Sequence, residues 1–418
     1  MKRRQFIPSV AATVMGAMVS SSSFSNHSVA RTPTNPDLPD EEFWKQIKSQ
    51  FRTGEIINLN NGGVSPHPLV VEEAFFNYHR ICNDTPSYNM WRILDKLKKN
   101  IRLKLSEIAG CDVDEIAINR NATESLVTII MGLPLAKGDE VVLSKFDYPR
   151  IMNAWKVREK RDGIKLQWVN PEQHSPDDST IIKRYTSLFN NKTKVVNLTH
   201  MINWTGRIIP VAQIIQEAKK YKITTIVDAA HSFAHIPFKI HDLDCDYLGT
   251  SLHKWLSAPF GNGMLYVRKE RIATTPTFFP TENDLDNDIK KFEELGTRNN
   301  AAEFAINEAI DFYLSIGAKR KYDRLIELRD YWINKVKKHP KIKIHTPLGE
   351  GKSGAICLIE ILDNKEPNID AMLMNLYNIH CVKIVHEGIE GIRITPNVYT
   401  SKEDLDVLVL GILHFADT

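Results

Sequence analysis

The sequence predicts an α/β protein whose large domain has a mainly parallel sheet and whose smaller C-terminal domain is α+β. Three observations lead to this fold class. The chain has 418 residues, which is too many for a single hydrophobic core. Between residues 115 and 267, short apolar runs alternate with helical patterns, as in the crossover units of a parallel sheet. After Thr297, two long helical stretches precede alternating strands.

The first thirty residues differ in composition from the rest of the chain. A basic start, with the pair Arg3-Arg4 followed by Phe6, precedes a weakly apolar run and the small-residue site Ser28-Val29-Ala30. This pattern predicts a twin-arginine-type signal peptide over residues 1–30. We therefore expect the mature chain to be exported to the periplasm and not to be embedded in a membrane. A basic N-terminus without a targeting role is the alternative.

Residues 31–58 begin as a linker and continue into a short amphipathic helix, which is predicted over residues 43–51. Apolar residues at helical spacing then predict one long helix over residues 89–109. Strands are predicted over residues 115–118, 140–143, 165–169, 194–198, 225–227, 247–250 and 263–267. The helices predicted between these strands cover residues 123–131, 151–161, 181–189 and 211–221.

The large domain is predicted to span residues 59–296, and the small domain residues 297–418. The helical stretches of the small domain cover residues 301–316, 319–338 and, at its end, 402–415. Its predicted strands cover residues 342–345 and 355–360. This mixture of separate helices and alternating strands is what predicts the α+β class for the small domain.

The composition argues against two kinds of site. Lys and Arg number 54 and Asp and Glu 51, for a formal net charge of +3, and no basic block stands out. This balance gives no reason to expect a nucleic-acid partner. The five cysteines are scattered, without CxxC or zinc-like spacing. We therefore expect neither a disulfide framework nor a metal site.

Lys254 is the first candidate for chemistry. It follows a predicted strand, in the stretch Ser251-Leu252-His253-Lys254-Trp255, amid apolar and small residues. A lysine in such a place is partly desolvated, so its amine loses its proton easily and becomes nucleophilic. The signal is modest by itself, because most lysines are solvated surface charges.

Two sites that precede Lys254 in the chain strengthen this interpretation, although each has a plainer alternative. Asp228 ends a predicted strand, and the carboxyl ends of strands in an open α/β sheet face the ligand crevice. The carboxylate can pair there with a protonated ring nitrogen, or it can cap a helix. Residues 119–125 precede an apolar helix, whose free N–H groups and Thr123 hydroxyl would face an anion. A capping box with Asn121 or Thr123 as the N-cap is the alternative.

Taken in order, these elements resemble the class V aminotransferase family of pyridoxal 5′-phosphate (PLP) enzymes, and the sequence looks most like the isopenicillin N epimerase-like branch. The resemblance runs from Asn58 to Ile412. The stretches that carry it are Asn60-Asn61-Gly62-Gly63-Val64-Ser65-Pro66, Asn121-Ala122-Thr123-Glu124, Gly138-Asp139-Glu140-Val141-Val142, Asp147-Tyr148-Pro149, Thr205-Gly206-Arg207-Ile208-Ile209-Pro210-Val211, Asp228-Ala229-Ala230-His231-Ser232, Ser251-Leu252-His253-Lys254-Trp255, Gly296-Thr297-Arg298-Asn299 and Gly391-Ile392-Arg393-Ile394-Thr395-Pro396.

The resemblance implies the fold and the roles of the matching residues. The fold would be PLP-dependent transferase fold type I, with residues 31–58 packed on the small domain and a homodimer completing each active site. Lys254 would hold the cofactor as a Schiff base and act as acid and base, with Asp228 at the pyridinium nitrogen and Arg393 at the substrate α-carboxylate. The other implied cofactor contacts are Tyr148 on the ring face, Asn203 and His231 at the phenolic oxygen, Ala122, Thr123, Ser251 and His253 at the phosphate, and Thr297 from a partner subunit. The implied catalytic residues are Lys254, Asp228 and His231.

The implied chemistry takes place at the α-carbon of an amino acid or an amino-acid-derived substrate, and the branching step is open. Proton return decides between transamination and epimerisation, whereas loss of a β-substituent gives cysteine desulfurase or C–S lyase chemistry. A desulfurase needs a nucleophilic cysteine, and Cys381 lies twelve residues before Arg393. Residues 378–385 alternate like a strand, which favours buried packing of Cys381 over a catalytic role.

Two features leave the substrate and the second base open. Arg207 stands where many relatives have a small or β-branched residue, which suggests a substrate different from theirs. No second base for epimerisation is identifiable, and His253, His386 and Tyr399 are only candidates. A serine hydrolase is not indicated, because the sequence has no GxSxG motif.

Overall fold

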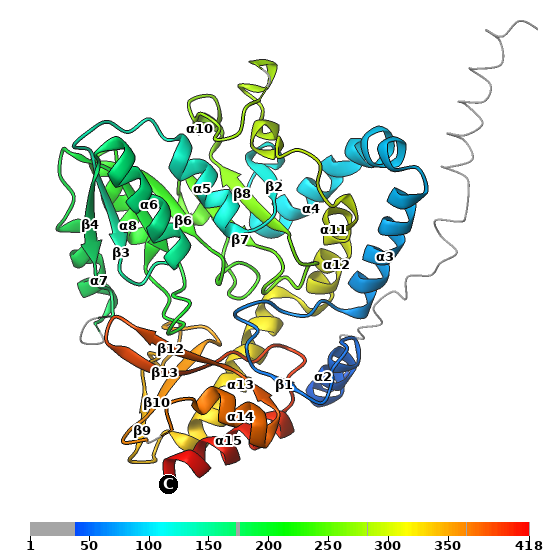
Figure 1. Ribbon diagram of the computed structural model, residues 1–418, viewed down its shortest axis with the longest axis vertical. Helices are drawn as coiled ribbons and strands as arrows, with labels where there is room; N and C mark the ends of the chain where they lie inside the picture. The colour runs from blue at the N-terminus through cyan, green and yellow to red at the C-terminus, as the bar shows by residue number, and fades with distance from the viewer. Residues whose placement is uncertain (1–37, 173–175, 282, 365, 418) are drawn as a thin grey trace, which may run out of the picture. The chain divides into compact units, whose positions relative to one another are not determined.

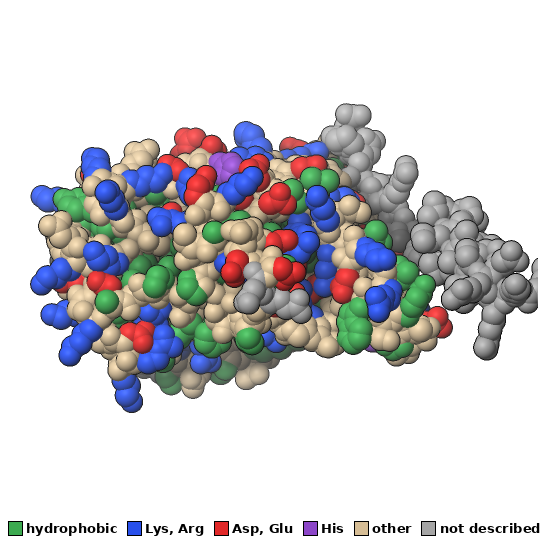
Figure 2. Space-filling model, turned by 90° about the horizontal axis from the view of Figure 1, so that it is seen from above, with side chains coloured by type: hydrophobic (Ala, Val, Ile, Leu, Met, Phe, Trp, Pro, Cys, Tyr) green, Lys and Arg blue, Asp and Glu red, His purple; other side chains and the backbone are tan. Residues whose placement is uncertain are grey.

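The computed structural model describes residues 38–172, 176–281, 283–364 and 366–417. The predicted signal peptide, residues 1–30, lies outside this part of the chain. No helix among the described residues is both long and apolar enough to cross a membrane. Figure 2 shows Lys and Arg side chains interspersed with Asp and Glu on the face that it presents.

A seven-stranded sheet positions most of the candidate site residues (Figure 1). The strand order is β2-β8-β7-β6-β5-β3-β4, with β8 antiparallel to both neighbours and the other pairs parallel. This arrangement confirms the predicted α/β class. Every residue of β2, β7 and β8 is buried, as expected for a sheet covered on both faces. The strands are β2 (Ile116–Asn119), β3 (Glu140–Ser144), β4 (Lys165–Val169), β5 (Thr193–Thr199), β6 (Thr224–Asp228), β7 (Tyr247–Ser251) and β8 (Gly263–Val267).

Helices α5 (Ala122–Gly132) and α6 (Pro149–Asp162) share one hydrophobic core with this sheet (Figure 1). Leu126 and Trp155 are fully buried in it against strand residues such as Val141 and Ile226. Four further helices lie between the strands of this sheet or directly after β8. They are α7 (Asp178–Thr186), α8 (Val211–Lys220), which packs on β5 and β6, α9 (Ile240–Leu243) and α10 (Lys269–Ile272). Because α5 and α6 both begin at the carboxyl edge of the sheet, their first turns border the same opening.

A second, antiparallel sheet of order β12-β13-β10-β9 lies in the C-terminal part of the chain (Figure 1). Its core packs around the fully buried Trp332. The elements are β9 (Ile342–Ile344), β10 (Cys357–Ile361), β12 (Val382–His386), β13 (Ile389–Ile394), α13 (Ala318–Val336), α14 (Ile369–Tyr377) and α15 (Lys402–Asp417). Sequence reasoning missed α14 and β13.

The first described helix, α2 (Asp40–Ser49), contacts this C-terminal part. Lys48 pairs with Asp404 at 3.0 Å, and Glu41 pairs with Lys402 at 2.6 Å. The two-residue strand β1 (Ile57–Asn58) pairs with β11 (Ile379–His380) in parallel. The N-terminal segment thus lies against α15 and β11. The division of the chain at residues 296 and 297 stays a prediction.

One predicted helix is confirmed only over its C-terminal part. Residues predicted as one helix over 89–109 form a π-helix, η2 (Tyr88–Leu94), a 3₁₀ turn, η3 (Asp95–Leu97), and α4 (Lys98–Ala109). Tertiary contacts account for the change. Asn300 donates hydrogen bonds to the Met90 carbonyl at 3.4 Å and to Asp95 at 3.2 Å. Periodicity cannot show such contacts with a distant helix.

Two further helices differ from the sequence prediction. The helix predicted over residues 301–316 is divided at Ala305 into α11 (Asn300–Phe304) and α12 (Ile306–Ile316). Helix α3 (Leu69–Asp84), which sequence reasoning missed, packs against both α11 and α12. Its buried residues, Val70, Val71, Ala74 and Cys82, follow helical spacing, so this pattern could have identified it.

Candidate active site

A cavity of about 630 Å³ opens at the carboxyl edge of the large sheet. Residues from β5, β6, β7, α5 and α6 line it together with residues from β12 and β13. This position agrees with the rule that ligands bind beyond the carboxyl ends of parallel strands. The lining residues are Gly62, Gly63, Val64, Asn121, Ala122, Thr123, Tyr148, Arg150, Ile151, Thr199, Asn203, Trp204, Asp228, Ala230, His231, Ser251, His253, Lys254, Val382, Ile384 and Arg393.

Lys254 lies in the turn between β7 and β8, and its amine faces the imidazole of His231. The distance between Lys254 Nζ and His231 Nε2 is 3.0 Å. Burial lowers the pKa of Lys254 to about 8; the carboxylate of Asp228 opposes this shift and the charge of Arg393 adds to it. A lysine with such a pKa is a good nucleophile, because a far larger fraction of it is unprotonated near neutral pH than of an ordinary lysine.

His231 stays neutral beside this amine. Burial lowers its pKa well below the ordinary value, and the positive charge of Lys254 lowers it further. Its Nδ1 has no hydrogen-bond partner in the described part of the chain. A neutral imidazole can either accept a hydrogen bond from Lys254 or donate one to it, depending on the tautomer. His231 can therefore keep a hydrogen bond to the Lys254 amine when that amine gains or loses a proton.

Asp228 is the last residue of β6 and caps no helix, so the predicted alternative of a helix N-cap is wrong. Its Oδ1 instead accepts a hydrogen bond from the N–H of Ala230, at 2.9 Å. Burial raises the pKa of Asp228, and the Ala230 N–H and the charge of Lys254 act in the opposite direction. The carboxylate is thus desolvated and would gain from a cation placed in the cavity.

The first turn of α5 forms one wall of the cavity. Asn121 caps this helix by accepting the N–H of Glu124 at 2.9 Å, while the N–H of Ala122 donates to Ser251 Oγ at 3.0 Å. The capping alternative and the anion-site interpretation are therefore compatible, because the cap leaves the helix N-terminus facing the cavity. The positive end of the helix dipole, the Thr123 side chain and Ser251 together favour an anion.

Arg393 reaches the same cavity from β13. The residue is 7% exposed, and its guanidinium donates to the Asn203 carbonyl and to Asn60 Oδ1, each at 2.9 Å. No carboxylate among the described residues forms an ion pair with it, which excludes a surface salt bridge as its role. Burial lowers the pKa of Arg393 to about 10. A buried arginine that lacks an anionic partner is suited to bind a ligand carboxylate through two parallel hydrogen bonds.

The other predicted site residues differ in their placement. Tyr148 precedes α6, lines the cavity and is 41% exposed. Asn203 is buried, and its Oδ1 has no partner among the described residues. His253 lines the cavity with Nδ1 on the Asn262 carbonyl at 3.0 Å, and burial lowers its pKa. Thr297 is exposed and does not line the cavity of its own chain.

Sequence reasoning missed several residues of the site. Thr199 ends β5 beside Asp228, and the strand-end rule that selected Asp228 could have selected it as well. Thr199 donates to Asp147 at 2.6 Å, and burial raises the pKa of Asp147 to about 7. Trp204 and Arg150 also line the cavity. Neither carries a local pattern that would have identified it.

Two interpretations concerning substrate and mechanism change with the structure. Arg207 forms a buried ion pair with Glu172 at 2.8 Å and does not line the cavity, so it gives no information about the substrate. Cys381 is 5% exposed within the C-terminal core, and burial raises its pKa to about 12. The expectation of buried packing for Cys381 thus agrees with the structure. None of the five cysteines, all of them in described segments, lines the cavity.

The three candidates for a second base differ in whether they line the cavity. The phenol of Tyr399 bonds to Asn61 at 2.6 Å and does not line the cavity. His386 lies outside the lining as well, with its Nε2 at 2.7 Å from the Lys145 carbonyl and its ring stacked on Trp204. Among the three candidates, only His253 borders the cavity.

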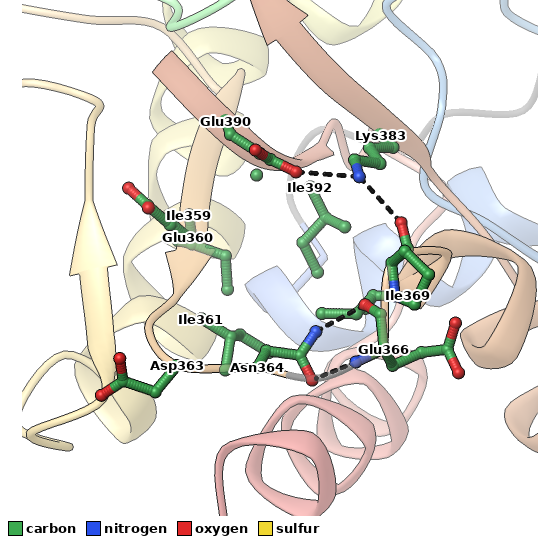
Figure 3. A pocket seen from close by; sticks show the side chains of 12 residues that line it. Ile359, Glu360, Ile361, Asp363, Asn364, Glu366, Ile369, Lys383, Glu390 and Ile392 are labelled. Atoms are coloured by element: carbon green, nitrogen blue, oxygen red, sulfur yellow. Dashed lines mark hydrogen bonds and ion pairs between the residues drawn. The ribbon is translucent and has the colours of Figure 1, made fainter. Parts of the chain in front are cut away.

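A second cavity, of about 390 Å³, lies on the C-terminal sheet (Figure 3). Three of its charged groups, Glu360, Lys383 and Glu390, form ion pairs. Lys383 forms an ion pair with Glu390 at 2.8 Å and donates to the Pro367 carbonyl at 2.8 Å, while Asn364 and Glu366 bond to each other (Figure 3). Isoleucines make up much of the remaining wall. We see no group here that is prepared for chemistry.

Comparisons with known proteins agree with this geometry. The family model for class V aminotransferases matches residues 57–408. The isopenicillin N epimerase of Streptomyces clavuligerus is 25% identical over 387 residues, which cover 87% of this chain and 96% of that protein. A probable cysteine desulfurase of a Synechocystis strain is 24% identical over 392 residues, covering 87% and 91%.

Solved structures share the fold at lower identity. A cysteine desulfurase from Escherichia coli has a TM-score of 0.78 at 19% identity, covering 90% of this chain and 98% of that one. A cystine C–S lyase in complex with cysteine persulfide has a TM-score of 0.77 at 20% identity, covering 86% and 98%. Both likenesses support the predicted fold type I.

Proposed function

The chain belongs to the class V aminotransferase family, whose enzymes use PLP, and we propose that it acts at the α-carbon of an amino acid by aminotransferase or epimerase chemistry. The predicted resemblance to this family is confirmed over residues 57–408. One observation carries the finer proposal. The reactive lysine, Lys254, and the unpaired arginine, Arg393, line the same cavity, and no cysteine does.

The residues of the cavity fit this cofactor. Asp228 offers a desolvated carboxylate for the ring nitrogen, and the first turn of α5 offers an anion site for the phosphate. Two buried polar atoms without partners among the described residues, His231 Nδ1 and Asn203 Oδ1, lie in residues that line the cavity. Lys254 supplies the amine that would hold the cofactor.

When bound, PLP withdraws electrons from the bonds at the α-carbon of the substrate. The chain decides which bond is weakened and where the proton goes. Arg393 would fix the α-carboxylate, and Lys254 Nζ would take the proton from the α-carbon. His231, neutral and 3.0 Å from that amine, would stabilise Lys254 in either protonation state. Asp228 would hold the ring nitrogen in its charged form.

The cavity lining distinguishes this proposal from a desulfurase that works through a protein thiol. Such an enzyme must bring a cysteine thiolate to the substrate sulfur. The thiol of Cys381 is buried in the C-terminal core, where burial raises its pKa to about 12. A thiol in that state is a poor nucleophile. C–S lyase chemistry without a protein thiol is the competing outcome of the test below.

The experiment has two stages. Purified protein should show the visible absorption band of lysine-linked PLP, and Lys254→Ala should abolish it, whereas the surface control Lys319→Ala should keep it. Single amino acids are then offered in D₂O. Deuterium at the α-carbon without a keto acid indicates epimerisation, and a keto acid indicates transamination. A protein that never binds PLP, or one that releases sulfide from cysteine as its main reaction, contradicts the proposal.

Export and assembly belong to the same proposal. We propose that the twin-arginine-type leader directs the protein to the periplasm, on the evidence of Arg3-Arg4 and the small-residue site before Arg31. We also propose a homodimer in which Thr297 of one subunit contacts the cofactor of the other. The exposure of Thr297, and its absence from the lining of its own cavity, support this arrangement.

A further inference from the structure

A second buried lysine lies beneath the turn that carries Lys254. Lys321, on α13, is 4% exposed and donates a hydrogen bond to the carbonyl of Trp255. In the described part of the chain no carboxylate forms an ion pair with this amine. Another group near it is the ring of Tyr313, whose centroid is 5.4 Å from Nζ.

The charge of Lys321 costs folding stability instead of adding to it. An ammonium group that leaves water without gaining an anion is unfavourable. Burial accordingly lowers the pKa of Lys321 to about 7, whereas a lysine in the unfolded chain keeps its proton up to about pH 10.4. The unfolded chain therefore binds more protons between these values, so this residue makes stability rise with pH across that window. An apolar side chain of similar length would avoid the cost.

The hydrogen bond from Lys321 completes the support of the active-site turn. Each carbonyl of residues 251–254 accepts a backbone N–H, at distances between 3.1 and 3.4 Å. The next carbonyl, that of Trp255, accepts the Lys321 amine from a different part of the chain. Ser257, two residues later, has a positive φ of 58°, a conformation that side chains other than glycine rarely adopt. Contacts from outside the turn, from Ser65 to the His253 carbonyl and from Lys321 to the Trp255 carbonyl, thus add to the hydrogen bonds within it.

Contacts through His235 connect Trp255 to the backbone of His231. The ring of Trp255 packs on His235, with 3.7 Å between centroids, and His235 Nε2 accepts the N–H of Ala355 at 2.9 Å. Because that amide can only donate, Nδ1 of His235 carries the proton and donates to the His231 carbonyl at 2.9 Å. Burial and, to a lesser extent, the charge of Lys321 lower the pKa of His235 to about 3, which keeps its ring neutral.

We propose that Lys321 is a positioning residue, which holds the Trp255 carbonyl and, through Trp255 and His235, keeps the Lys254 amine against His231. The inference rests on the proposed function in one respect, that Lys254 is the reactive amine. Helix α13 would thereby influence the Lys254–His231 pair indirectly, through Trp255 and His235. The buried ammonium group of Lys321 lowers folding stability, and its role is then to maintain the geometry of the Lys254–His231 pair.

Lys321→Met is the test, with Lys319→Met as the matched control, because Lys319 is on the same helix and its side chain is 83% exposed. The first measurement needs no cofactor. Acylation of Lys254 in the full chain is followed against pH by peptide mass spectrometry. The wild type and the control should show a midpoint near the Lys254 pKa of about 8. In Lys321→Met the midpoint should rise towards that of an ordinary lysine, because the amine is released from its desolvated position.

The second measurement uses the holoenzyme. In Lys321→Met, kcat should fall about tenfold to a hundredfold, as expected for a small misplacement of a reacting group, with KM little changed. The melting temperature should stay the same or rise. Lys321→Gln, which keeps a donor without the charge, should recover part of kcat and part of the Lys254 midpoint.

Two results would overturn the inference. One is an unchanged Lys254 midpoint and kcat in Lys321→Met. The other is a less stable or unfolded Lys321→Met, because the ammonium would then act by holding the fold together. Failure of the proposed function is recognised separately, as a wild-type protein that acylates at Lys254 with the expected midpoint and yet binds no PLP.

Discussion

Arg393 shows how a single residue can indicate its ligand. It is buried, donates among the described residues to the Asn203 carbonyl and Asn60 Oδ1 alone, and faces a cavity whose lining contains one carboxylate, Asp228. These neutral acceptors orient the guanidinium and leave its charge uncompensated. The cost of burying that charge is offset only when an anion arrives. We therefore expect binding energy for the substrate to be concentrated at this residue.

Replacing Arg393 with lysine should weaken substrate binding and leave PLP binding largely intact. Lysine keeps the charge and loses the two-pronged geometry, a difference of about 1.5–3 kcal/mol, the usual size of a hydrogen bond to a charged group. Steady-state kinetics should show KM raised by about tenfold or more. Arg80→Lys, at an exposed position outside the cavity lining, is the control. An unchanged KM in Arg393→Lys would mean that the carboxylate binds elsewhere.

At the scale of elements, the site depends on the close approach of β8 to the start of α5. Gly263 opens β8 beside Asn121, the residue that caps α5. A Cβ on Gly263 would lie 2.6 Å from the backbone of Asn121, which is closer than real contacts allow. Glycine is required here by space, because the N-terminus of α5 must reach Ser251 on the neighbouring strand.

Gly263→Ala should therefore displace the first turn of α5 and weaken the anion site. We expect a loss of about 1–3 kcal/mol in the free energy of unfolding, the usual cost of overpacking a core. A weaker affinity for PLP, measured by absorption titration, should accompany it. Gly54→Ala is the control, since an added Cβ there meets nothing within 4 Å. Normal PLP affinity in Gly263→Ala would show that the phosphate does not use this helix.

At the scale of the whole molecule, the proposed homodimer makes a prediction about two inactive variants. Lys254→Ala lacks the reactive amine, and Thr297→Arg should block the cofactor contact proposed for the partner. If Thr297 serves the other subunit, a mixed dimer of the two variants contains one site with both residues intact. Co-expression should then restore activity that neither variant has alone. A mixed dimer without activity, verified by two different affinity tags, would place Thr297 in its own subunit's site.

The sequence by itself determined the class of the fold, the strand order along the chain and the candidates Lys254 and Asp228. These rest on local patterns, because apolar runs, helical spacing and strand ends are properties of neighbouring residues. The irregular helix at residues 88–97 escaped prediction because Asn300 shapes it from far along the chain.

Only the tertiary structure decided how the site is assembled. The contact of Lys254 with His231, the arrival of Arg393 from β13 and the support of the turn by Lys321 all join segments distant in sequence. Their distances depend on sheet order and on the packing of α13, which no local pattern contains. Burial, which lowers the pKa of Lys254 to about 8, is likewise a property of the folded chain.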